Sequence, residues 1–124
     1  PVAVTWSGSI PNWLRALERI RAFGARKVVA GHGPVLIGPE INAAIDRGIR
    51  FWSNLHTDAT CLYDQGVPVA EAVARMNIQN YPEAAATLPI IVTAIYHERD
   101  PDIPYLDLTQ AIESIAAQLA HAHG

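Results

Sequence analysis

The stretch from residue 39 to residue 65 carries an apolar side chain at almost every third or fourth position. The members of this series are Ile41, Ile45, Ile49, Trp52, Leu55, Ala59 and Leu62. Because an α-helix turns once every 3.6 residues, this spacing places them on one helix face. The pattern predicts a helix of about 40 Å at about 1.5 Å per residue, ending at Gly66. Such a length exceeds what a small domain needs, so we expect a bend near Gly48.

A shorter helix is predicted before it. Its apolar face would consist of Ile10, Trp13, Leu14, Leu17 and Ile20. Ser9 is suited to cap the first turn, because its hydroxyl can accept a hydrogen bond from a free backbone amide. Gly24 is suited to end the helix in the left-handed conformation that follows many helices.

Further helices are predicted in the second half of the chain. A short helix is expected from Pro68 to Met76 and a turn over residues 77–81. Another helical stretch starts at Pro82, and Pro89 either kinks or restarts it. The sequence Asp-Pro-Asp-Ile-Pro at 100–104 breaks the pattern, and a last amphipathic helix covers residues 106–120. Its apolar face would consist of Leu108, Ile112, Ile115, Ala116 and Leu119.

Composition restricts the class of protein. Half of the 124 residues are apolar and 17% are charged, which is enough apolar material for a core and argues against disorder. No apolar run reaches the length of a membrane span, and the N-terminus does not resemble a signal peptide. The net charge is −3 and Lys and Arg are scattered. We therefore expect no membrane and no nucleic acid among the partners, and a cytoplasmic location is favoured.

The segment from Lys27 to Pro34 holds the strongest functional signal. Two β-branched residues, Val28 and Val29, predict one short buried strand over residues 27–30. Glycines on both sides of His32 let the backbone turn tightly and leave the imidazole uncovered. From these residues alone, His32 is either a metal ligand or catalytic base, or a histidine that fills a turn.

The order of these elements carries a resemblance. A helix, a strand, the sequence Gly-His-Gly-Pro-Val and a long helix, with Trp6-Ser7-Gly8 and Asn12-Trp13 before them, resemble the C-terminal half of the metallo-β-lactamase fold. This hydrolase superfamily includes glyoxalase II-type thioesterases. The resemblance implies an α/β fold class: half of an αββα arrangement, mostly helical here with one short strand. Residues 1–99 would be the C-terminal portion of that domain, and residues 100–124 a linker and amphipathic helix.

The resemblance also implies a metal site. Members bind one or two metal ions, usually zinc, through a His-x-His-x-Asp-His motif, two further histidines and a bridging aspartate. His32 matches the last of those histidines, whereas the motif is absent from these 124 residues and the bridging aspartate would precede Pro1. In such enzymes, zinc lowers the pKa of a bound water that attacks an ester, thioester, amide or phosphoester. This chain would then contribute His32 as a metal ligand and no catalytic residue.

Other candidates have simpler explanations. His56 is expected to be a partly exposed helical residue, and His97 to end a helix, where a positive charge is favourable to the helix dipole. His121 and His123 are expected to belong to a frayed terminus. Cys61 is expected to be a buried thiol. Trp13, Trp52 and Tyr96 are assigned to the core, whereas Trp6 either packs in the core or lines a pocket.

Two interpretations of function remain open at this point. In the first, the chain is a fragment of a zinc-dependent hydrolase, inactive alone, whose other ligands come from a missing N-terminal half or another chain. In the second, it is a non-catalytic helical module that covers its apolar faces by forming a homo-oligomer. Half of a fold leaves apolar faces uncovered, and such faces drive association.

Overall fold

The computed structural model describes residues 9–76, 80–81, 84 and 86–122. The elements in chain order are α1 (Ile10–Ala22), β1 (Lys27–Val28), β2 (Leu36–Ile37), α2 (Pro39–Asp64), α3 (Val69–Arg75), α4 (Leu88–Arg99) and α5 (Leu108–Ala122). The described part of the chain is therefore mostly helical, with one small antiparallel sheet formed by β1 and β2.

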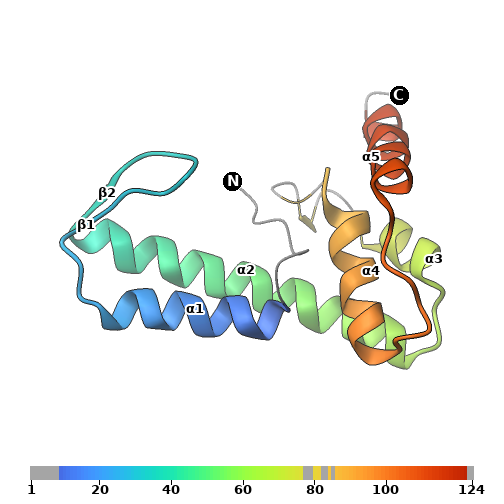
Figure 1. Ribbon diagram of the computed structural model, residues 1–124, viewed down its shortest axis with the longest axis horizontal. Helices are drawn as coiled ribbons and strands as arrows, with labels where there is room; N and C mark the ends of the chain where they lie inside the picture. The colour runs from blue at the N-terminus through green and yellow to red at the C-terminus, as the bar shows by residue number, and fades with distance from the viewer. Residues whose placement is uncertain (1–8, 77–79, 82–83, 85, 123–124) are drawn as a thin grey trace.

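Helices α1 and α2 lie side by side as a long antiparallel pair (Figure 1). The Ser9 side chain accepts a hydrogen bond from the Asn12 amide at 3.3 Å, and Gly24 has φ +60°, so both predicted helix ends are confirmed. Helix α2 continues unbroken through Gly48. A β-carbon at Gly48 would lie 3.3 Å from Cδ1 of Leu17, so this glycine lets the two helices pack closely.

The end of α2 follows a regular hydrogen-bonding motif. Gly66 has φ +73°, its amide donates to the Tyr63 carbonyl at 2.8 Å, and the Val67 amide donates to the Leu62 carbonyl at 3.0 Å. These two bonds satisfy carbonyl groups that the helix itself leaves free. Gly66 thus ends the long helix as predicted.

The strand prediction was only partly right. One strand over residues 27–30 was expected, whereas the structure has two strands of two residues each, with Lys27 opposite Ile37 and Val28 opposite Leu36. The expectation of a buried strand was also wrong, because Val29 is 71% exposed. An apolar pattern in one segment does not reveal which segment it pairs with or which side chains a neighbour covers.

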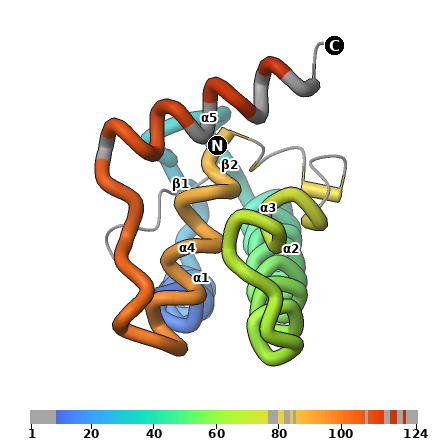
Figure 2. The backbone as a smooth tube through the Cα atoms, turned by 90° about the vertical axis from the view of Figure 1, so that its right-hand side faces the viewer, coloured from blue at the N-terminus to red at the C-terminus, as the bar shows by residue number. Residues whose placement is uncertain are grey.

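The core lies at the opposite end, where α4 contacts α2, α3 and α5 (Figure 2). Helix α4 is buried on nearly all sides, and its most enclosed side chains pack against Leu55 of α2 and Ile10 of α1. The Tyr96 hydroxyl donates to the Val67 carbonyl at 3.0 Å, which satisfies both groups inside the core. The assignment of Trp52 and Tyr96 to the core is confirmed, and Trp13 is half-buried.

Two helix predictions need correction in detail. Helix α4 begins at Leu88 with Pro89 in its first turn, so the proline restarts the helix; residues 77–79, 82–83 and 85 lie outside the described part. In α5, Ala111 is buried whereas Ile112 is 57% exposed. The prediction that Ile112 belongs to the buried face of α5 was therefore wrong. The side chains of Leu108, Ile115 and Leu119 lie outside the described part of the structure.

Candidate functional site

His32 lies in the loop that joins β1 to β2. This hairpin leaves the end of the α1–α2 pair that is farthest from α3 and α4 (Figure 1). All residues from 29 to 35 are exposed, so the imidazole is uncovered as the sequence predicted. Of the two flanking glycines, only Gly33 needs the left-handed region, with φ +95°. The loop therefore presents His32 outward without burying it in the helical core.

The base of the hairpin is fixed by hydrogen bonds that two backbone amides donate. The Gly38 amide donates to the Arg26 carbonyl at 3.1 Å, and the Ile37 amide donates to the Glu40 carboxylate at 3.3 Å. Gly38 has φ +57° and immediately precedes α2. These contacts join both strands to the start of the long helix, so His32 is held at the tip of an anchored hairpin.

The described residues do not form a complete metal site. Within the described ranges, no group of three or more His, Cys, Asp or Glu side chains is placed to hold a metal ion. A catalytic zinc needs about three protein ligands, and His32 supplies one nitrogen. The side chain of His121 and all of His123 lie outside the described residues, as does Trp6.

The other described histidines have structural surroundings. His97 donates from Nδ1 to the Ile103 carbonyl at 2.6 Å, and the centroid of its ring lies 3.9 Å from the centroid of the Tyr105 ring. Burial, and then the positive charge of Arg99, lower the pKa of His56 and favour its neutral form. His56 is half-buried on α2, as predicted, and His97 lies in the last turn of α4, as predicted. Both lie on elements other than the hairpin.

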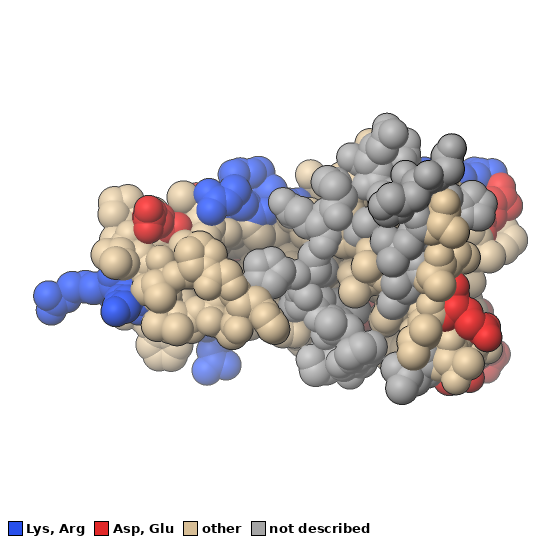
Figure 3. All heavy atoms as spheres, turned by 90° about the horizontal axis from the view of Figure 1, so that it is seen from above, with Lys and Arg blue, Asp and Glu red and all other residues tan. Residues whose placement is uncertain are grey.

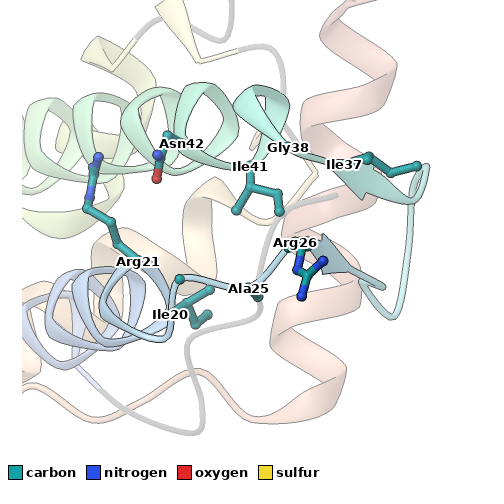
Figure 4. A pocket seen from close by; sticks show the side chains of 9 residues that line it. Ile20, Arg21, Ala25, Arg26, Ile37, Gly38, Ile41 and Asn42 are labelled. Atoms are coloured by element: carbon teal, nitrogen blue, oxygen red, sulfur yellow. The ribbon is translucent and has the colours of Figure 1, made fainter.

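A cavity of about 440 Å³ lies beside the base of the hairpin. Figure 4 shows Ile20 from α1 and Ile41 from α2 facing this space, with Arg26 and Asn42 at its border. Arg21 also lines it and donates to Asp46 at 2.6 Å, and this hydrogen bond lowers the pKa of the Asp46 carboxyl. The lining residues that the structure describes include no nucleophile and no general base.

A smaller cavity of about 240 Å³ lies between α2, α3 and Tyr81. The Tyr81 hydroxyl donates to the Asp58 carboxylate, and burial together with this carboxylate raises the pKa of Tyr81. Cys61 lines the cavity but is exposed, so the prediction of a buried thiol was wrong. It follows Ala59 by two positions, which turns it well away from the buried face of the helix.

Sequence reasoning missed a second feature of the hairpin end. Large apolar side chains are exposed there: Ile20, Phe23, Val29, Val35 and Ile37. The run Val35-Leu36-Ile37, directly after Pro34, was the available signal for a second strand. The hairpin therefore combines an accessible histidine with an uncovered apolar surface.

Within the described ranges, no helix combines the length and the hydropathy needed to cross a membrane. Comparison of the chain with models of protein families, with curated proteins and with solved structures finds no match.

Proposed function

We propose that this chain supplies His32 as one ligand of a zinc-dependent hydrolase site whose other ligands lie outside residues 1–124. They would come from a preceding half of the fold or from another chain. The observation that carries this proposal is the exposure of His32 on a hairpin anchored to α2.

The surroundings of the hairpin support a covering partner. Phe23 is 78% exposed and Ile37 is 59% exposed, and both lie near the hairpin base. Single exposed apolar residues are ordinary, whereas several together mark an interaction surface. A second half of the fold placed here would cover these side chains and could bring further ligands toward His32.

The same apolar side chains favour a second candidate function, a non-catalytic module that associates with copies of itself. Burying about 800 Å² of apolar surface corresponds to about 20 kcal/mol at about 25 cal/mol per Å², before the cost of association is subtracted. This would be enough to hold a dimer together. The two candidates differ in whether His32 has a role.

We expect the isolated chain to lose added zinc on dialysis and to hydrolyse no ester or thioester. One histidine holds zinc weakly, because about three ligands are needed for a stable site. Zinc content after dialysis can be measured by elemental analysis. His32→Ala is the matched control, and it should retain as little zinc as the unaltered chain. A stoichiometric zinc that survives dialysis, together with ester hydrolysis, would contradict the proposal that the site is divided.

A further inference from the structure

We propose that copies of this chain associate head to tail, with the hairpin end of one copy docked on the α5 end of the next. This inference deepens the self-association proposed above and rests on it. The hairpin surface is defined by the exposed apolar residues Ile20, Phe23, Val29, Val35 and Ile37 together with Arg26 and Lys27. The α5 surface is the segment from Asp102 to Glu113.

Apolar exposure is concentrated at these two places. Among the described residues, the large apolar side chains that remain exposed are the five of the hairpin surface and two in the α5 surface, Tyr105 and Ile112. The two surfaces lie toward opposite ends of the long axis of the molecule (Figure 1). One copy therefore cannot cover its own hairpin with its own α5 surface, but a second copy can.

Charge is divided in the same way, so the sequence-based description of Lys and Arg as scattered was wrong. Residues 1–50 hold seven of the nine basic side chains and three of the twelve acidic ones, a net charge of +4. The remaining residues hold two basic and nine acidic side chains, a net charge of −7. On the face that Figure 3 shows, most basic side chains lie toward one end and most acidic ones toward the other.

The charges decide which surface covers the hairpin. A two-fold dimer through the hairpin would bring the positive charges of Arg26 and Lys27 from both copies into one interface, and like charges across an interface oppose binding. The α5 surface instead offers Asp102, Asp107 and Glu113 beside its apolar side chains. Opposite charges and exposed apolar residues on both sides favour the head-to-tail arrangement. Such a contact uses different patches on the two copies and can repeat from copy to copy.

Two variants test this arrangement. The hairpin variant carries Phe23→Ala and Arg26→Glu, and the α5 variant carries Ile112→Ala and Glu113→Gln. All four side chains are exposed, so both variants should fold, which circular dichroism can check. Each variant alone should be monomeric in analytical ultracentrifugation at concentrations where the unaltered chain associates. Mixed in equal amounts, they should form a one-to-one pair, because each supplies the surface that the other lacks.

We expect the mixed pair to bind at least ~10-fold more tightly than either variant binds itself, since each lone variant has lost one charge pair and one apolar contact. Association of the unaltered chain should weaken between about 50 mM and about 500 mM salt, because salt screens exposed charges. Arg75→Glu is the matched control. Arg75 pairs with Glu71 within α3 at 2.5 Å, and its reversal changes the net charge as Arg26→Glu does. It should leave association intact.

Three outcomes would overturn the proposal. If the unaltered chain stays monomeric at high concentration, both self-association and the head-to-tail arrangement fail. If the α5 variant alone still dimerises and the mixture forms no pair, self-association stands and the arrangement is two-fold through the hairpin. If association persists in both variants, it uses neither surface.

Discussion

Replacing His32 by Ala should lower zinc affinity at least ~100-fold in a polypeptide that joins a His-x-His-x-Asp-His half to Pro1. Loss of a residue that only orients a ligand already costs about 10- to 100-fold, and loss of a ligand itself should cost at least as much. The hairpin leaves His32 exposed in this chain, so the imidazole is free to reach ligands brought by another segment. Competition with a chromophoric chelator measures the affinity.

Gly31→Ala is the matched control for this substitution. Gly31 adjoins His32, does not need the left-handed conformation, and an added β-carbon would meet no atom within 4 Å. This variant should keep its zinc affinity. A polypeptide that binds zinc equally well with and without His32 would show that the histidine is not a ligand.

The second large effect concerns stability. We expect Leu55→Ala to reduce the free energy of unfolding by about 2 to 5 kcal/mol, because the substitution leaves a cavity in a closely packed core. Leu55 has no exposed surface and lies where α2 packs against α4. A typical domain is stable by only about 5 to 15 kcal/mol, so this loss is a large fraction of the total. Urea denaturation followed by circular dichroism measures it.

Phe23→Ala removes a larger side chain at the other end of the molecule, where Phe23 is 78% exposed. In the monomer this variant should change the free energy of unfolding by less than about 0.5 kcal/mol. Equal losses for the two variants would mean that the core does not lie where α2, α3 and α4 meet.

The helices of the first half could be predicted because their signals are local. The apolar residues of α1 and α2 repeat at the helical period, and Ser9, Gly24 and Gly66 mark the ends through hydrogen bonds and backbone angles near each helix terminus. Such signals act over a few residues and need no knowledge of the rest of the fold.

What depends on distant partners could not be predicted in the same way. The pairing of Val28 with Leu36 is decided by two segments together, and the sequence pattern describes each segment separately. The exposure of Cys61 and of Ile112 depends on which neighbour covers each helix face. Both residues lie in helices that were predicted, but the direction of each side chain relative to its neighbours was not.

The candidate site shows the same division. The position and exposure of His32 follow from the strand before it and the glycines beside it, and the structure agrees with both. The ligand set does not follow, because within the described residues no group of three or more His, Cys, Asp or Glu side chains is placed to hold a metal ion. The charge asymmetry was present in the sequence, yet its meaning depends on the hairpin and α5 lying at opposite ends.

The most direct test of His32 as a ligand is the nitrogen-15 spectrum of the histidine side chains in the joined polypeptide, recorded before and after zinc is added. The two nitrogen signals that are missing from the spectrum of His32→Ala belong to His32. One His32 nitrogen should shift to a metal-bound position once the zinc ion that His32 ligates has bound. Unchanged His32 signals in a polypeptide saturated with zinc would contradict the assignment of His32 as a ligand.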